Sequence, residues 1–176
     1  MSTTPPRPEA PLAAPPRPVV QVVDDAPESL GFLCDALDAA GYRVLVAHSG
    51  EAALEGCQLV APDAVLMDAM MPGGLDGFET CRRLKAEPTL SHVSVIFMTG
   101  LAETAHIVEG FAAGGVDYVV KPVRVEEVLA RLATHVRNAH VARRAREAVA
   151  ALQQRHPLQA EPPARLRAAS LTPRET

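Results

Sequence analysis

The chain has 176 residues, of which 48% are hydrophobic, and a formal net charge of −4. This composition excludes a wholly disordered protein, and no uninterrupted apolar segment approaches the ~20 residues that a membrane helix needs. Prolines near the N-terminus exclude the apolar stretch of a signal peptide, and three cysteines, an odd number, argue against a disulfide framework. We therefore expect a cytoplasmic protein without membrane contact.

Proline separates a folded middle from two extended ends. Seven of the 16 prolines fall in residues 1–18 and four in residues 157–176, a density that favours unpacked chain. We predict four segments in order: a disordered proline-rich tail over residues 1–17, a folded domain over residues 18–138, a helical extension over residues 139–155 and a flexible linker over residues 156–176.

Charge changes sign along the chain. Residues 1–123 carry 7 Lys and Arg against 16 Asp and Glu, a net of −9, whereas residues 124–176 carry 10 against 5, a net of +5. A basic end can favour nucleic acid, but an arginine-rich helix is more often a solvated face. We interpret these arginines as a solvated face.

Strand and helix patterns alternate through the folded domain. The predicted strands are short apolar runs bounded by Gly, Pro, Asp or Ser, at Val19–Val23, Tyr42–Ala47, Ala64–Met67, Val93–Met98 and Tyr118–Val120. Helical patterns lie between them, at Pro27–Ala40, Ser49–Cys57, Phe78–Ala86 and Ala105–Ala113. Units this short imply right-handed crossovers, so we expect an α/β fold: a five-stranded parallel, doubly wound, flavodoxin-like sheet with helices on both faces.

A long helix is predicted from Arg124 to about Arg155, because this stretch has neither proline nor glycine. Its apolar positions step by three and four residues and include one irregular step that resembles a stammer. They are Val125, Leu129, Leu132, Val136, Ala139, Ala142, Ala145, Val149 and Leu152. We expect the first turns to pack on the sheet and the fifth helix to extend into a coiled coil that forms a homodimer. An isolated solvated helix, or pairing through the sheet-packed helix and its neighbours, is the alternative.

Five polar residues stand at the carboxyl ends of the predicted strands, where ligands bind in such sheets. They are Asp24, Asp25, Asp68, Thr99 and Lys121. Carboxylates about 4 Å apart repel one another by about 4 kcal/mol at an effective dielectric constant near 20, and a divalent cation relieves this repulsion. Mg²⁺ suits the site because it accepts carboxylate, water and phosphate oxygens.

We predict Asp25 and Asp68 as direct Mg²⁺ ligands, Asp24 as a ligand directly or through water, and the backbone carbonyl of Met70 as a further ligand. Asp68 is then the nucleophile that forms an acyl phosphate.

In this arrangement Lys121 supplies a mobile positive charge and Thr99 a hydroxyl donor for the phosphoryl oxygens. Each residue also has a plain structural reading: a turn or cap for Asp24 and Asp25, a strand end for Thr99, and a surface charge for Lys121. Their joint placement at one edge favours the site.

The motifs that carry these residues resemble, in order, the receiver domain of two-component response regulators. They are Val19–Val23 with Asp24-Asp25, Asp68-Ala-Met-Met71-Pro72, Asp76–Glu79, Met98-Thr99-Gly100 and Tyr118–Pro122, and the likeness covers about residues 18–138. The resemblance implies that a sensor histidine kinase donates phosphate to Asp68. It also implies a cis Lys121–Pro122 bond and an aromatic switch at Tyr118, which turns inward when Thr99 is drawn to the phosphate; ordinary packing of Tyr118 is the alternative.

Two features complete this interpretation. The turn Gly73–Gly77 is one residue longer than the usual family pattern, so we expect a reshaped glycine-rich loop with metal ligation intact. The six histidines have no metal-like pairing, and we interpret them as surface or satisfied core residues.

The output is suggested by Ala168–Glu175, which resembles the start of the helix-turn-helix domain of LuxR-type regulators, with Thr172 as a cap before Pro173. We expect a response regulator cut before its DNA-binding domain, so that DNA is contacted only through a C-terminal domain absent from this chain. The protein would catalyse only its own phosphorylation and slow dephosphorylation, since Met70 and Leu101 offer no group to orient water. A Mg²⁺-dependent aspartyl-phosphate phosphatase would need an aspartate where Met70 stands. A constitutive dimeric adaptor with a vestigial site is the third hypothesis.

Overall fold

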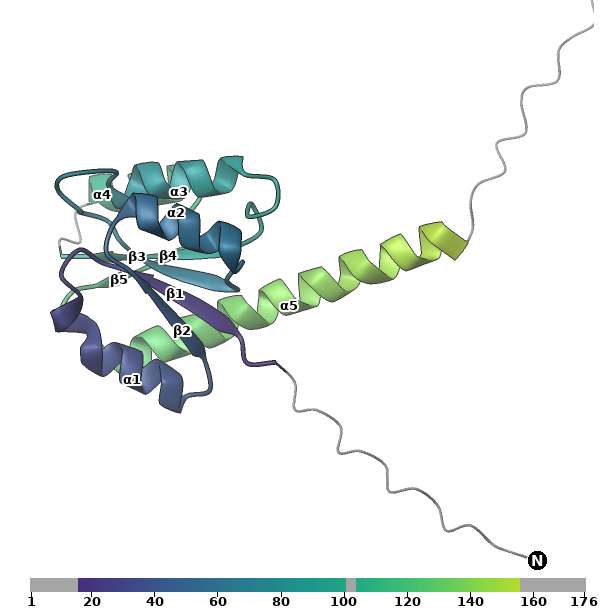
Figure 1. Cartoon of the computed structure of the whole chain (residues 1–176), viewed down its shortest axis with the longest axis horizontal. Coiled ribbons are helices and arrows are strands. Elements are labelled where there is room, and N and C mark those ends of the chain that lie inside the picture. The colour runs from purple at the N-terminus through teal and green to yellow at the C-terminus, as the bar shows by residue number, and fades with distance from the viewer. Residues whose placement is uncertain (1–15, 101–103, 156–176) are drawn as a thin grey trace, which may run out of the picture. The chain divides into compact units, whose positions relative to one another are not determined.

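A computed structural model of the chain describes residues 16–100 and 104–155. Five parallel strands form one sheet in the order β2-β1-β3-β4-β5, with helices between them (Figure 1). The elements are β1 (Val19–Val23), the 3-10 turn η1 (Pro27–Leu30), α1 (Gly31–Ala39), β2 (Arg43–Ala47), α2 (Gly50–Leu59), β3 (Ala64–Asp68), α3 (Gly77–Ala86), β4 (Ser94–Thr99), α4 (Thr104–Ala112), β5 (Asp117–Val120) and α5 (Val125–Arg155). The doubly wound α/β architecture predicted from the sequence is confirmed.

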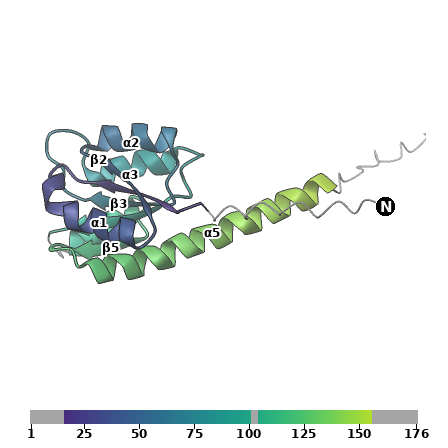
Figure 2. The same ribbon diagram turned by 60° about the horizontal axis from the view of Figure 1, so that its bottom comes forward.

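Both faces of the sheet are covered, because successive side chains of each strand point to opposite sides. Along β3, Val65 and Met67 join the core cluster under α2 and α3, whereas Ala64 and Leu66 join the cluster under α1 and α5. Figures 1 and 2 show α2 and α3 on one side of the strands and α1 and the start of α5 on the other. β3 and β4 are therefore apolar apart from Ser94 at the start of β4 and the site residues at their carboxyl ends.

Two element boundaries differ from the sequence prediction in a way that matters for the site. β3 and β4 each run one residue further than predicted, because Asp68 still pairs with Met98 and Thr99 still pairs with Val120. Both side chains therefore stand on the last paired residue of a buried strand. The first turn of the predicted helix from Pro27 is instead the 3-10 turn η1.

The glycine-rich loop is fixed to its neighbours. Gly73 has φ +91, a conformation that favours glycine, and the backbone N–H of Leu75 donates to Glu51 Oε1 at 3.1 Å. Asp76 then caps α3 by accepting from the N–H of Glu79 at 2.8 Å. A Cβ atom on the next residue, Gly77, would lie 2.1 Å from the Asp68 carbonyl oxygen, so α3 can start this close to β3 only with glycine there.

Helix α5 is anchored to the sheet by its first turns. Val128, Leu132 and Val136 are buried, and Val125 and Leu129 are partly buried beside them. Polar contacts add to this packing. The Asp117 carboxylate, at the start of β5, accepts from Arg131 Nη1 at 2.9 and 3.0 Å and lies 3.0 Å from His135 Nε2, and His140 Nε2 lies 2.9 Å from Asp63 Oδ1.

The remainder of α5 is solvent-exposed. A compact unit ends at Val141, and the second unit begins at Ala142, within the helix. In this second unit Val149 and Leu152 expose 53% and 62% of their surface.

None of the helices in the described part of the chain combines the length and the apolar character that a bilayer crossing requires.

Candidate functional site

The site begins with two buried aspartates at neighbouring strand ends. Asp24 directly follows β1 and is 2% exposed, whereas Asp68 ends β3 and is 6% exposed. Backbone N–H groups hold both carboxylates, since Asp24 Oδ1 accepts from Ala26 at 2.8 Å and Asp68 Oδ1 accepts from Met70 at 3.1 Å. The exposed Asp25 completes the group. One oxygen from each of the three carboxylates lies within 4.8 Å of the others.

Lys121 supplies the positive charge of the site. Its Nζ lies 3.0 Å from Asp24 Oδ2 and 3.1 Å from Asp68 Oδ2, so a single ammonium group bridges two buried carboxylates. The lysine comes from the loop after β5, and the Lys121–Pro122 peptide bond that follows it is cis, as the resemblance implied. Asp24, Asp25, Asp68 and Lys121 therefore converge, although up to 97 residues separate them in sequence.

The pKa values reflect this crowding. Burial raises the pKa of Asp68, and the Asp24 charge raises it further, although the Met70 N–H and the Lys121 ammonium oppose the shift. Burial alone would lower the pKa of Lys121, but its bonds to the two aspartates outweigh burial and raise it. Lys121 is therefore fully charged at neutral pH. The site nevertheless holds more negative charge than one lysine balances.

The donor set fits a small divalent cation. Three carboxylates offer oxygen atoms within one coordination sphere of each other, and hard oxygen donors of this kind are what Mg²⁺ binds. Met70, whose backbone carbonyl is the further predicted ligand, lies two residues after Asp68 and is 56% exposed. A cation would bring positive charge to the carboxylates that Lys121 leaves unbalanced.

An open pocket of about 290 Å³ lies beside Asp68. It is lined by Asp68, Met70, Thr99, Gly100, His106 and Lys121. The Thr99 side chain, buried at the end of β4, thus shares a pocket with the aspartate and the lysine. The pocket therefore brings the Asp68 carboxylate, the Thr99 side chain and Lys121 to one shared space.

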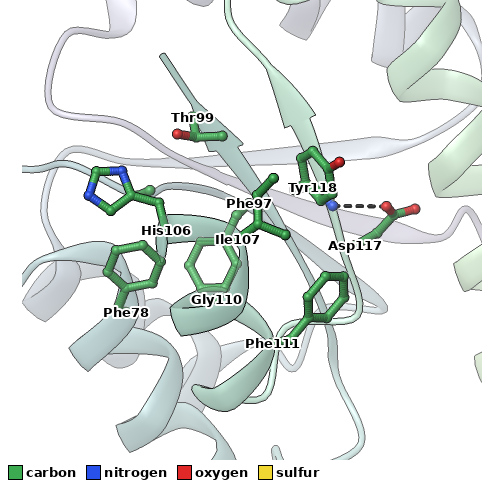
Figure 3. Close-up of a pocket in the computed structure, with 10 residues that line it drawn as sticks. Phe78, Phe97, Thr99, His106, Ile107, Gly110, Phe111, Asp117 and Tyr118 are labelled. Carbon is green, nitrogen blue, oxygen red and sulfur yellow. Dashed lines mark hydrogen bonds between the residues drawn. The ribbon is translucent and has the colours of Figure 1, made fainter. Parts of the chain in front are cut away.

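Tyr118 lies outside this pocket, at a second and smaller cavity of about 10 Å³. Figure 3 shows His106 and Phe78 at one end of this cavity and Tyr118 with Phe111 at the other. The Tyr118 ring is partly buried and meets Phe111 edge-on, with 6.4 Å between the ring centroids. Thr99 lines both spaces, so it adjoins the pocket of Asp68 as well as the cavity of Tyr118.

The sequence interpretation of His106 is wrong. It was expected to be a surface or satisfied core residue, yet its Nδ1 is buried and has no hydrogen-bond partner among the described residues. The residue lies two positions after the start of α4, at the strand edge that carries the site, and lines both cavities. Its position near the start of a helix that follows a site strand is the signal that could have identified it. By contrast, His135 and His140 have carboxylate partners, as expected.

Comparisons with known proteins agree with this geometry. Residues 20–133, more than half of the chain, match the response regulator receiver domain. The chain is 36% identical over 113 residues to response regulator PleD of Caulobacter vibrioides, covering 64% of this chain and 25% of that protein. It is 35% identical over 118 residues to DNA-binding response regulator MtrA of Mycolicibacterium smegmatis, covering 67% of this chain and 50% of that protein. The chain thus spans a quarter to a half of the length of these curated relatives.

A solved structure gives the same result. Chemotaxis protein CheY4 of Vibrio cholerae superposes with a TM-score of 0.64 at 27% identity, covering 68% of this chain and 98% of that one. Sequence match, strand order and the acidic edge of the sheet all lead to one assignment. The chain belongs to the response regulator receiver domain family, whose members are phosphoacceptor switches of two-component systems.

Proposed function

We propose that this protein accepts a phosphoryl group on Asp68 from a sensor histidine kinase, in a Mg²⁺-dependent reaction. The observation that carries the proposal is the bridge from Lys121 to Asp24 and Asp68, at 3.0 and 3.1 Å, inside a group of three carboxylates. Titratable groups with shifted pKa values that gather in a pocket are typical of functional sites. A site that handles a further cation and a phosphoryl group accounts for it.

The proposed reaction uses the chain's own residues as follows. A carboxylate oxygen of Asp68 forms a bond to phosphorus while the bond from phosphorus to the donor atom breaks, and the donor atom keeps that electron pair. Lys121 then transfers its contact from the carboxylates to a phosphoryl oxygen, and the Thr99 hydroxyl donates to another. Mg²⁺ held by Asp24, Asp25, Asp68 and the Met70 carbonyl would screen the repulsion between the two anions.

The response to phosphorylation is proposed to pass through Thr99 and Tyr118. Drawing the Thr99 hydroxyl toward the phosphoryl group changes the wall of the small cavity, and the Tyr118 ring follows inward, away from Phe111. Because residues of α4 and β5 also line that cavity, the surface of these elements changes as well. Moving such an equilibrium from 1:99 to 99:1 takes about 5.5 kcal/mol of differential interaction.

We infer that α5 makes the protein a homodimer. Its exposed apolar residues after Val141, including Val149 and Leu152, cannot be buried within a single helix and fit a coiled coil with a second copy. Residues 1–17 are proposed as a tail, residues 18–138 as the receiver domain, residues 139–155 as the dimerising extension and residues 156–176 as a linker.

The output is proposed to be transcriptional, in a cytoplasmic protein, through a helix-turn-helix domain of the LuxR type. The motif at Ala168–Glu175 supports this and lies outside the described residues. Relatives support transcription more broadly, since they include a DNA-binding response regulator and a phosphate regulon transcriptional regulatory protein.

Replacement of Asp68 by Asn tests the central proposal. The wild-type chain should acquire one acid-labile phosphate from a small acyl phosphate in Mg²⁺, and the Asp68→Asn variant should acquire none. An exposed aspartate in α1, Asp35, provides the matched control, because Asp35→Asn should label normally. Full labelling of Asp68→Asn would refute the assignment.

Two other measurements test the alternatives. Continuous turnover of a phosphoester would indicate a phosphatase instead, and a sedimentation coefficient that beryllofluoride leaves unchanged would indicate an adaptor.

A further inference from the structure

One polar side chain in the phosphoacceptor pocket has no role in the mechanism above. His106, in the first turn of α4, lines the pocket together with Asp68, Thr99 and Lys121. It also lines the small cavity that contains Tyr118. The imidazole thus lines both the pocket of the acceptor carboxylate and the cavity of the proposed switch, where Figure 3 shows it at the end opposite Tyr118.

The hydrogen-bonding capacity of this ring is not used within the described residues. Its Nδ1 is buried without a partner, and the neighbouring Phe78 ring, whose centroid is 6.1 Å away, offers no polar group. Buried polar atoms in native proteins are nearly always paired, so an unpaired one calls for an explanation. The polar groups of Asp68 and Lys121 in the same pocket are already bonded to each other.

We propose that His106 is a phosphoryl-binding residue, whose imidazole N–H donates to an oxygen of the phosphoryl group on Asp68. This inference rests on the proposed function. A phosphoryl group brings several acceptor oxygens into the pocket, and Lys121 and Thr99 approach it from β5 and β4. His106 adds a donor from α4, a third element. An imidazole always carries at least one N–H, and bonds to an anionic acceptor are stronger than neutral ones.

The contact also gives α4 a direct link to the phosphoryl group. Thr99 and Tyr118 connect the site to the switch along β4 and β5, whereas His106 belongs to the helix itself. A bond from His106 to the phosphoryl group would therefore restrain the first turn of α4 only in the phosphorylated protein.

The test uses the full chain with beryllofluoride and Mg²⁺ as a phosphoryl mimic. His106→Phe keeps a ring but removes the N–H groups, and His106→Asn restores a donor. The exposed His92, in the loop before β4, provides the control His92→Phe. Loss of a bond to a charged acceptor should weaken beryllofluoride binding about tenfold or more in His106→Phe. His106→Asn should lie between His106→Phe and the wild type, His92→Phe should match the wild type, and the Mg²⁺ affinity should be the same in all four proteins.

A second measurement does not depend on any variant folding correctly. In the ¹⁵N-labelled wild type, the imidazole resonances of His106 should shift when beryllofluoride binds, and those of His92 should not. Unmoved His106 resonances, or a His106→Phe affinity within about twofold of the wild type, would overturn the inference and leave the role of Asp68 intact. Failure of the wild type to bind beryllofluoride or accept phosphate would overturn both.

Discussion

The bridge made by Lys121 leads to a quantitative prediction for the variant Lys121→Met. At 3.0 and 3.1 Å, its attraction to each carboxylate is about 5 kcal/mol at an effective dielectric constant near 20, before the cost of desolvation. Removing one partner of a buried pair typically costs 3–5 kcal/mol. Because the Lys121 side chain is 29% exposed, we expect a smaller cost, about 2–3 kcal/mol, in buffer that contains a chelator instead of Mg²⁺.

Added Mg²⁺ should then reduce the difference in the free energy of unfolding between Lys121→Met and the wild type. Without the lysine, Mg²⁺ has no competitor for Asp24 and Asp68, so saturating Mg²⁺ should raise the free energy of unfolding more in Lys121→Met than in the wild type. Urea unfolding followed by circular dichroism, with and without Mg²⁺, measures both quantities.

The sequence provides a matched control, because Lys85 and Lys121 are its only lysines. Lys85 Nζ donates to the carbonyls of Ser91 and Val93, and among the described residues it forms no ion pair with the acidic group. Lys85→Met should therefore lose the same stability with and without Mg²⁺. Equal stabilisation of Lys121→Met and the wild type by Mg²⁺ would refute the idea that the lysine and the cation share these carboxylates.

Three further predictions concern stability and reactivity. Burial alone would raise the pKa of Asp117, but the bonds from α5 and from the Tyr118 N–H outweigh burial and lower it. The Asp117 carboxylate therefore contributes stability above its unfolded pKa, and this contribution is lost as the pH falls through its folded pKa. Asp117→Asn should therefore cost about 1–2 kcal/mol at pH 7 and much less near pH 3, as urea titrations at both pH values would show. Gly77→Ala should disrupt folding, because its Cβ would lie 2.1 Å from a backbone oxygen, whereas Gly31→Ala, with nothing within 4 Å, should not lower the melting temperature. Burial raises the pKa of Cys57 and Cys81 to about 11, so mass spectrometry should find both unalkylated by iodoacetamide at pH 8 until the chain is unfolded.

Much of the site could be predicted from the sequence, because the fold converts order along the chain into position. In a parallel sheet every strand ends at the same edge, so Asp24, Asp68 and Thr99 needed only correct strand ends to be placed together. The predicted ends of β3 and β4 were one residue too early, but Asp68 and Thr99 are placed at the carboxyl end of their strand by the predicted and by the observed boundaries alike. The bridge from Lys121 to two carboxylates depends on side-chain geometry and could not be read from spacing.

Helix α5 shows why the burial pattern was harder to predict. The predicted seam of steps of three and four omitted Val128, yet this residue is 1% exposed. A helix packed on a sheet buries a wider stripe than a helix paired in a coiled coil, so Val125, Val128, Leu129 and Leu132 all face the core cluster. A heptad pattern therefore describes two different surfaces in succession along this one helix.

The incorrect interpretation of His106 has a related cause, because the sequence pattern does not show how a helix is rotated relative to the site. Periodicity shows which face of a helix is apolar, but the phase of α4 relative to the site depends on the loop that precedes it. His106, two positions into that helix, could equally have faced solvent, but in the structure it lies beside Phe78 and lines the pocket. Its neighbours on α4 show the difference, since Val108 and Phe111 remain 61% and 50% exposed although both are apolar. On this helix polar His106 lines the pocket of Asp68 whereas apolar Val108 is largely exposed, so apolar periodicity alone does not identify the face of α4 that meets the site.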